Sequence, residues 1–179
     1  APAETVEAET PPPAELVEAE PLSLAEAVAG DWRSDDEKAR DGWRNPAETL
    51  EFFEVEPSDT VVEIWPGGGW YTNVLAPYLA SGDGPLVAAV WDVNVFEGER
   101  LERIEQRIAD FKAVYEADAD LFGTIEYSAF SAESGALAEA GTADAVLTFR
   151  NVHNWMGNDY TAKFFTDAYE ALKPGGHRS

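Results

Sequence analysis

The sequence has no cysteine and only two histidines among 179 residues, so several kinds of site are excluded before any motif is considered. Without cysteine the chain forms neither a disulfide nor a thiolate metal site. His153 and His177 are too few for a metal centre built from histidine. Carboxylates could still bind a hard cation, but no calcium-loop motif is present. We therefore predict no metal site.

Basic residues are also scarce, because 12 Lys and Arg stand against 35 Asp and Glu for a formal net charge of -23. A field of this sign repels polyanions and anionic membrane surfaces. We therefore predict that nucleic acid is not a partner. The simplest interpretation of the acids is a well solvated, soluble and salt-adapted surface, and a specific cation-binding face is the alternative.

No apolar stretch reaches the roughly 18 residues of a membrane span. No basic segment followed by an apolar one indicates an intact signal peptide either. The chain starts at Ala1 rather than Met, which fits removal of an export signal or a shortened chain. We therefore expect a periplasmic or exported location, with a cytoplasmic location as the alternative.

Residues 1–30 differ in composition from the rest of the chain. They hold seven glutamates, five of the eleven prolines and no Lys or Arg. Such a segment cannot bury enough apolar surface to offset the entropy lost on ordering. We predict a disordered acidic, Pro-rich tail over 1–30, with one short helix over 22–28, and a folded domain over 31–179.

Four apolar runs rich in β-branched residues alternate with helical patterns, which is typical of a parallel sheet. Alternating strands and helices predict right-handed crossovers. The fold class is therefore α/β, a Rossmann-like parallel sheet with helices on both faces. The predicted strands are 60–65, 85–92, 123–130 and 143–149.

The helices between these strands follow from apolar spacing and from capping residues. Asn45 before Pro46, with Glu48 three residues after the cap, predicts a helix N-terminus. Pro77 is expected to end or kink the helix that contains it. The predicted helices are 46–53, 70–80, 98–116, 132–140 and 159–172.

The segment "EIWPGGG" (63–69) closes the first strand. In an open parallel sheet, ligands bind beyond the carboxyl ends of the strands. Gly67, Gly68 and Gly69 let the backbone approach a ligand closely, and the helix that begins near Trp70 offers free N–H groups. Ligand binding is one interpretation of this segment, and a plain turn is the other.

Asp92 closes the second strand, 25 residues after Gly67. A carboxylate at this position can accept hydrogen bonds from both hydroxyls of a ribose. The alternative is an aspartate that caps a helix or is only solvated.

Polar and titratable residues follow the fourth strand in "FRNVHNW" (149–155). Arg150, Asn151 and His153 would stand where a substrate meets a cofactor, and His153 could act as a general base because imidazole changes protonation near neutral pH. The alternative is that these side chains only satisfy the loop backbone.

The segments "ARDGWRNPAETLEFF", "VVEIWPGGGWYTNVLAPYL", "LTFRNVHNW" and "ALKPGG" together resemble a group of bacterial class I S-adenosylmethionine-dependent methyltransferases, over residues 31–176. The family pattern is acid-x-Gly-x-Gly-x-Gly, and this chain carries Trp65 and Pro66 at the first Gly and its neighbour. The resemblance implies S-adenosylmethionine as cofactor, with the methionine part at the glycine turn, the ribose at Asp92, and the loop after the fourth strand facing the methyl group. The implied cofactor residues are Glu63, Pro66, Gly67, Gly68, Gly69 and Asp92, and the implied catalytic residues are Arg150, Asn151 and His153.

The C-terminus departs from this family, whose sheet has seven strands. Only "HRS" follows "KPGG", so we expect a truncated sheet of four strands in the order 3-2-1-4. The fourth strand, with Val146 and Leu147, would then be an apolar edge through which the protein could associate with itself.

The sequence therefore predicts an S-adenosylmethionine-dependent methyltransferase that acts on a small molecule, with activity in doubt because of the truncation. One alternative is a non-catalytic exported binding or scaffold domain. Another is an NAD-binding, oxidoreductase-like domain, although NAD would bring a pyrophosphate to an acidic protein whose glycine turn has no basic neighbour.

Overall fold

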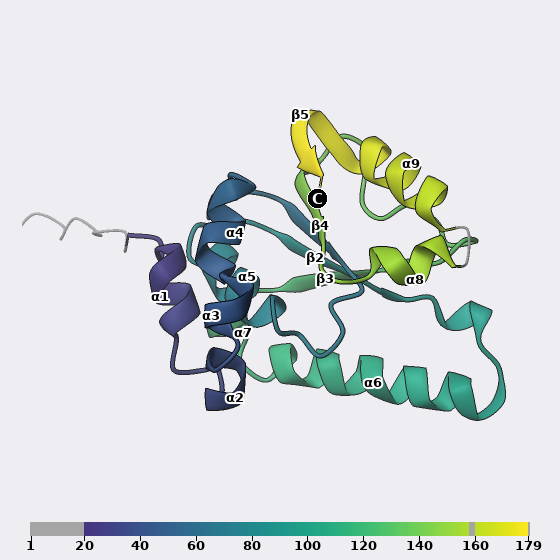
Figure 1. Ribbon diagram of the computed structural model, residues 1–179, viewed down its shortest axis with the longest axis horizontal. Coiled ribbons are helices and arrows are strands. Elements are labelled where there is room, and N and C mark those ends of the chain that lie inside the picture. The colour runs from purple at the N-terminus through teal and green to yellow at the C-terminus, as the bar shows by residue number, and fades with distance from the viewer. Residues whose placement is uncertain (1–19, 158–159, 179) are drawn as a thin grey trace, which may run out of the picture.

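The computed structural model describes residues 20–157 and 160–178. One sheet of parallel strands has the order β3-β2-β1-β4-β5 (Figure 1). This arrangement confirms the predicted α/β, Rossmann-like fold. The strands are β1 (Val61–Ile64), β2 (Leu86–Trp91), β3 (Ile125–Phe130), β4 (Ala143–Thr148) and β5 (Leu172–Arg178).

The prediction that the fourth strand is an open edge is wrong. The backbone that follows the last helix forms β5, which pairs with β4 through Ala143 and Leu172 and, beyond an irregularity, through Ala145 and His177. The sequence pattern placed the edge of the sheet at the fourth strand because "KPGG" indicates the end of a helix and gives no sign of a further strand. Since β4 is an inner strand, the expected self-association through its edge loses its basis.

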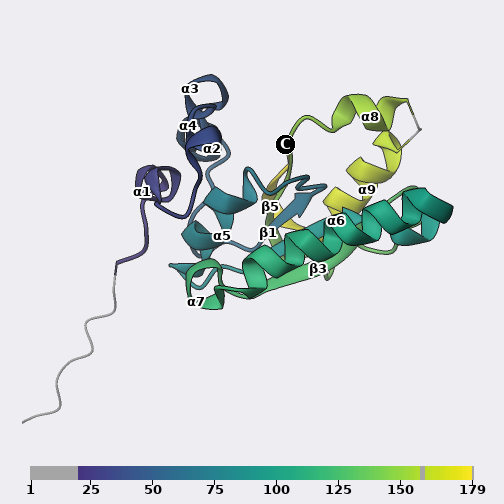
Figure 2. The same cartoon turned by 90° about the horizontal axis from the view of Figure 1, so that it is seen from below.

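Helices cover both faces of the sheet, and each face has its own apolar core (Figures 1 and 2). Side chains alternate between the faces along a strand, so Val61 belongs to one core and Val62 to the other. The first core is covered by α1 (Leu24–Ala29), α4 (Pro46–Phe52), α5 (Thr72–Ala80), α6 (Gly98–Glu116) and α7 (Ala119–Phe122). The second is covered by α8 (Val152–Met156) and α9 (Thr161–Ala171).

Helix α5 continues through Pro77, although the sequence predicted an end or a kink there. A proline has no N–H to donate to the carbonyl four residues earlier, which here belongs to Asn73. The indole N–H of Trp32 donates to that Asn73 carbonyl at 2.8 Å. The orphaned acceptor is therefore satisfied from outside the helix, and α5 ends only at Ala80.

Asn45 begins α4 as predicted, but it does not cap the helix through its side chain. Asn45 adopts a left-handed conformation (φ 42°) and also ends α3 (Asp41–Arg44). The Pro46 start, rather than a capping box, marks this N-terminus.

The predicted helix over 132–140 is absent from the structure. Ser131 and Ser134 side chains bond the local backbone instead: the Ser131 N–H donates to Ser134 Oγ at 2.9 Å, and the Glu133 N–H donates to Ser131 Oγ at 3.1 Å. Such bonds compete with the helical pattern. The crossover from β3 to β4 is therefore irregular.

The N-terminal part of the described chain packs onto the domain. The part of the predicted tail that the structure describes, residues 20–30, includes α1, whose Leu24 and Ala27 are buried against α4 and α5. A short α2 (Asp35–Lys38) and α3 follow it and lead toward the carboxyl ends of the strands. Residues 1–19 of the predicted tail lie outside the described residues.

In the described part of the chain, no helix is long and apolar enough to cross a membrane. Over the same residues, no group of three or more histidine, aspartate or glutamate side chains could hold a metal ion.

Candidate functional site

The turn after β1 is held in shape by the backbone and by α6. Trp65 stands at the first-glycine position of the family pattern in a left-handed conformation (φ 50°), which glycine adopts without strain. The Gly69 N–H donates to the Pro66 carbonyl at 3.0 Å. A Cβ on Gly69 would lie 2.1 Å from the Tyr115 hydroxyl, so Gly69 serves packing.

Gly67 and Gly68 differ from Gly69, because a Cβ on either would meet no protein atom within 4 Å. Both are exposed. At Gly67 a positive φ of 66° still favours glycine, whereas Gly68 has no such φ. Within the protein itself, nothing therefore requires a glycine at 68.

These two glycines line a cleft of about 510 Å³ at the carboxyl ends of β1 and β4. The cleft brings together most of the predicted site residues, while Gly69 and Asp92 are not in its lining. Its walls are Glu37, Arg40, Arg44, Glu63, Trp65, Pro66, Gly67, Gly68, Trp70, Tyr71, Phe149, Arg150, Asn151 and His153.

Glu63 forms the floor of this cleft and is only 2% exposed. Thr72 Oγ1 donates a hydrogen bond to Glu63 Oε2 at 2.6 Å. Burial raises the pKa of Glu63 to about 7, and the bond from Thr72 opposes this only in part. Glu63 is thus a buried acid that can ionise when a cation arrives near neutral pH.

Asp92 lies in a separate hollow of about 300 Å³ beyond β2 and β3. Its neighbours there include Phe96, Arg100 and Ser131. Trp65 and Asn151 line both the hollow and the cleft. The two predicted cofactor acids therefore lie in adjacent cavities that share a wall.

Asp92 is 6% exposed, and its carboxylate is already hydrogen-bonded by the protein. Asp92 Oδ1 accepts from the backbone and side-chain nitrogens of Asn94 at 3.0 and 2.9 Å, and Oδ2 accepts from Ser131 Oγ at 2.8 Å. Burial raises the pKa of Asp92, but these bonds outweigh it and leave the pKa lowered. Asp92 thus caps the short η1 (Val93–Val95), which was the alternative interpretation, and it still faces the hollow.

The Trp65 side chain packs on the face of the sheet that α8 and α9 cover. Its ring centroid lies 5.8 Å from that of Phe130, 5.7 Å from that of Trp155 and 6.2 Å from that of Trp91. The Trp65 indole N–H donates to the Phe130 carbonyl at 3.0 Å. Trp65, at the position of the first glycine of the family pattern, therefore forms part of the wall between the two cavities.

The three predicted catalytic residues all line the cleft, but they differ in what they contact. The Asn151 amide nitrogen donates to the carbonyls of Ile64 and Trp65 at 3.3 and 3.2 Å and to Thr148 Oγ1 at 3.0 Å. It ties the end of β4 to the end of β1. Arg150, in a left-handed conformation (φ 65°), and His153 on α8 are exposed.

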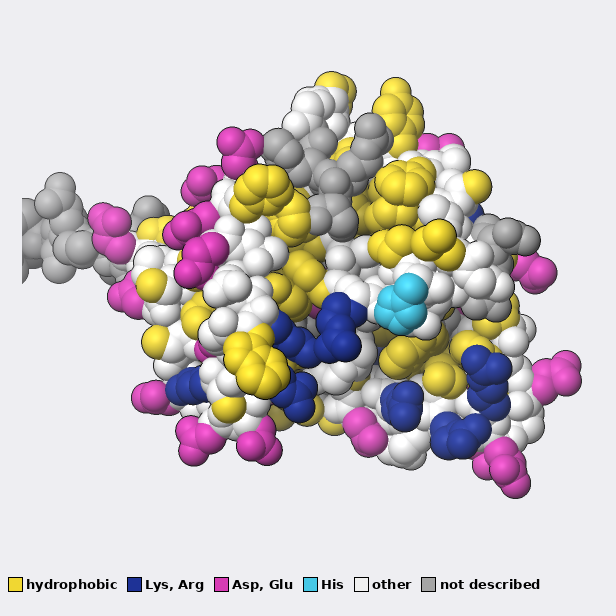
Figure 3. All heavy atoms as spheres, viewed as in Figure 1, with side chains coloured by type: hydrophobic (Ala, Val, Ile, Leu, Met, Phe, Trp, Pro, Cys, Tyr) yellow, Lys and Arg dark blue, Asp and Glu magenta, His cyan; other side chains and the backbone are white. Residues whose placement is uncertain are grey.

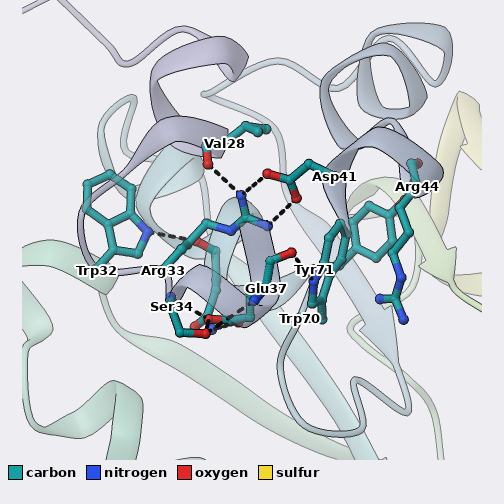
Figure 4. A network of polar contacts seen from close by, with 10 residues as sticks. Val28, Trp32, Arg33, Ser34, Glu37, Asp41, Arg44, Trp70 and Tyr71 are labelled. Carbon is teal, nitrogen blue, oxygen red and sulfur yellow. Dashed lines mark hydrogen bonds and ion pairs between the residues drawn. The ribbon is translucent and has the colours of Figure 1, made fainter. Parts of the chain in front are cut away.

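Sequence reasoning missed the contribution of α2 and α3. Arg40 and Arg44 line the cleft together with Arg150, and Arg44 lies over the Trp70 ring at 4.3 Å (Figure 4). Tyr71 and Phe149 stack with centroids 3.5 Å apart between these segments. The basic residues near Arg40 were visible in the sequence, but nothing in a local pattern placed them at the strand ends.

A larger hollow of about 670 Å³ lies on the α6 side of the same glycine turn. Gly67 and Gly68 line it together with Asn73, Arg107 and Tyr115. The turn is thus bordered by open space on both sides.

The sequence matches no protein-family model and has no significant match among curated proteins. Among solved structures, the chain is similar to a SAM-dependent methyltransferase from Aquifex aeolicus, with a TM-score of 0.54 and 16% identity over 86% of this chain and 69% of that one. It is also similar to coclaurine N-methyltransferase bound to N-methylheliamine and SAH (TM-score 0.49, 13% identity, 92% of this chain and 44% of that one). The O-methyltransferase TomG from Streptomyces achromogenes gives a TM-score of 0.43 at 16% identity, over 91% and 66% of the two chains.

The chain therefore has the fold of S-adenosylmethionine-dependent methyltransferases, as its likeness to the Aquifex structure shows. At 16% identity this likeness concerns the fold alone. The chain spans less than half of the coclaurine enzyme and about two thirds of the other two proteins.

Proposed function

We propose that this domain binds S-adenosylmethionine and transfers its methyl group to a small molecule. The observation that carries the proposal is the pair of adjacent cavities, one with Glu63 beside two open glycines and the other with Asp92. Both lie at the carboxyl ends of the strands, where α/β sheets of this kind bind nucleosides.

The residues of the two cavities fit the two ends of this cofactor. Glu63 suits an ammonium group, because a cation at the cleft floor would offset the cost of ionising a buried acid. Because Gly67 and Gly68 have no Cβ, they leave space at the turn that a ligand can fill. Asp92 keeps the charged form that accepts hydrogen bonds from ribose hydroxyls.

When bound, S-adenosylmethionine supplies an electrophilic methyl group on a sulfonium. The task of the protein is then to orient the acceptor and to exclude water, and orientation alone can lower a barrier by several kcal/mol, on the order of 7 to 11 in the best cases. His153 is an exposed residue of the cleft that can take a proton from an acceptor hydroxyl or amine. Asn151 positions this side of the cleft through its three hydrogen bonds.

Isothermal titration with S-adenosylmethionine and with S-adenosylhomocysteine tests the proposal. We expect both ligands to bind with dissociation constants below about 1 mM, which corresponds to about 4 kcal/mol. The sample must first show a cooperative thermal transition, so that a missing signal cannot come from unfolded protein.

The same titration with NADH separates the oxidoreductase-like alternative. Binding of NADH with no binding of either S-adenosyl ligand would overturn the methyltransferase proposal. A folded sample that binds none of the three would support a non-catalytic domain.

A further inference from the structure

Three arginines at the mouth of the cleft, Arg40, Arg44 and Arg150, form what we call the arginine cluster. Arg40 precedes α3, Arg44 is the last residue of α3 and Arg150 is the second residue after β4, and all three line the cleft. With Trp43 they also line an adjoining hollow of about 560 Å³. Figure 3 shows basic side chains gathered in the middle of this face beside a histidine, with acidic side chains mainly around the outline.

The members of the cluster are close enough to repel one another. Burial lowers the pKa of Arg44, and the charges of Arg150 and Arg40 lower it further. Like charges at such range are unfavourable unless something of opposite sign lies between them. In a chain with 35 acidic residues, a grouping of this kind is not the outcome of a general charge excess.

The ion pairs of the described residues do not neutralise the cluster, since they are Arg33–Asp41, Lys163–Asp167 and Lys173–Asp144. Figure 4 shows the contrast around Trp70: the Arg33 guanidinium is bound by Asp41 and the Val28 carbonyl, whereas the Arg44 guanidinium points away from them with no partner drawn. Arg33 is therefore bound by polar groups of the protein, whereas Arg44 contacts the Trp70 ring and no hydrogen bond or ion pair of its guanidinium is found among the described residues.

Two acids share the cleft with the cluster, Glu37 and Glu63. Glu37 is occupied by hydrogen bonds from the Ser34 backbone and hydroxyl and from the Asn73 amide. Glu63 lies at the buried floor, where Thr72 donates to it. Neither acid forms an ion pair with the cluster among the described residues.

Two residues of the cleft have a left-handed backbone conformation. Of the five non-glycine residues with positive φ in the described chain, Trp65 and Arg150 line it. Each such conformation costs on the order of 1 to 3 kcal/mol and persists only where the surrounding structure enforces it. Arg150 combines this conformation with a side chain that lines the cleft.

We propose that the arginine cluster binds the anionic group of the methyl acceptor, so that the substrate is a small carboxylate or phosphate ester. This proposal rests on the proposed methyltransferase function. Guanidinium groups bind both anions in a bidentate way, so the cluster selects a negatively charged group with two neighbouring acceptor oxygens. Trp43, which is 90% exposed, gives a flat ring of the acceptor a surface to contact.

The test uses benzoate, phenyl phosphate and the neutral benzyl alcohol as probes, titrated into the protein saturated with S-adenosylhomocysteine. We expect one or both anions to bind and benzyl alcohol to bind at least about tenfold more weakly. The carboxylate and phosphate probes identify which anionic group is preferred. Equal affinity for the neutral and anionic probes would overturn the proposal.

Variants assign the binding to the cluster. Arg44→Gln and Arg150→Gln should each weaken anion binding by about tenfold. Arg103→Gln removes the same charge from the exposed side of α6 and should leave binding unchanged. Equal losses in all three variants would overturn the proposal, because the effect would then come from net charge alone. Thermal unfolding of each variant shows that the fold is kept.

S-Adenosylhomocysteine distinguishes the acceptor site from the cofactor site. If it competes with the anions, the cluster binds the carboxylate of the cofactor, and the acceptor proposal fails while the proposed function stands. If the anions bind and S-adenosylhomocysteine does not bind at all, both the proposed methyltransferase function and the proposed acceptor site are wrong. Simultaneous binding of S-adenosylhomocysteine and an anion supports both proposals.

Discussion

Glu63 and Asp92 lie at the carboxyl ends of the neighbouring strands β1 and β2, yet their surroundings shift the two pKa values in opposite directions. Glu63 has one donor, Thr72, and its burial raises the pKa to about 7. Asp92 has donors on both oxygens, and its pKa is lowered. The comparison teaches that position at a strand end does not set the charge of a carboxylate, because the number of donors that face it does.

The largest effect is expected from Glu63→Gln as the pH changes. In the unfolded chain Glu63 has its ordinary pKa of 4.5, and in the folded protein the pKa is about 7. Between these values the folded state binds more protons, so rising pH removes stability, by about 3 kcal/mol once the pH exceeds 7. Glutamine carries no such cost, and the variant should gain stability over the wild type between pH 5 and pH 8.

Urea unfolding of both proteins at pH 5 and pH 8 measures this gain. Asp92→Asn is the matched control: because the pKa of Asp92 is lowered from 3.8, its stabilising contribution is already complete at pH 5, and the variant should be less stable than the wild type by the same amount at pH 5 and pH 8. A constant difference between Glu63→Gln and the wild type at both pH values would contradict the raised pKa.

Asp92→Ala is the next test and concerns ligand affinity. If the carboxylate binds a ribose, its loss should weaken S-adenosylhomocysteine by about 1 to 3 kcal/mol, or roughly 5- to 150-fold, measured by isothermal titration. Ser131→Ala is the control, because it removes a donor to Asp92 and leaves the carboxylate in place. If both variants lose stability and neither loses affinity, Asp92 only caps η1.

Trp65 stands between the two acids, so its replacement tests the wall that they share. Trp65→Gly loses the ring contacts to Phe130 and Trp155 but relieves the positive φ, and we expect a net loss of about 1 to 2 kcal/mol in unfolding free energy. Trp65→Ala loses the same contacts and keeps the strain. The glycine variant should therefore be more stable than the alanine variant by about 1 kcal/mol. The reverse order in denaturant unfolding would mean that φ at this position is not strained.

Gly68→Ala should have the smallest effect on the fold. A Cβ at Gly68 meets no protein atom, so we expect a change in unfolding free energy within about 0.5 kcal/mol. The same Cβ enters the cleft and should weaken S-adenosylhomocysteine by about tenfold. Gly69→Ala is the contrasting variant, because it collides with Tyr115 and should destabilise the fold. Unchanged affinity in Gly68→Ala would move the ligand away from this turn.

Much of the fold could be predicted from the sequence, because a buried parallel strand and a long amphipathic helix have strong periodic patterns. The range 98–116 for α6 and the strands around Val62 and Val87 followed from such patterns. The errors occur where a tertiary contact decides. The Trp32 indole donates to the carbonyl that Pro77 leaves without a partner, so the helix continues. Hydrogen bonds of Ser131 and Ser134 stabilise a loop where a helix was predicted. Strand β5 depends on its pairing with β4.

The candidate site shows the same division. Glu63, Asp92 and His153 were identified because strand ends in this architecture meet at one edge of the sheet. Arg40 and Arg44 were not assigned, since α2 and α3 reach the cleft only through packing around Trp70. Long-range packing of this kind leaves no local periodicity in the sequence.

The Asn151 amide joins two sides of the cleft, the end of β1 and the start of α8. Its three hydrogen bonds fix the residue that begins α8 to the last residues of β1 and β4. The start of α8, the helix that carries His153, is therefore tied directly to the residue that opens the glycine turn. The distance between the glycine turn and α8 is thus set by hydrogen bonds of a single amide.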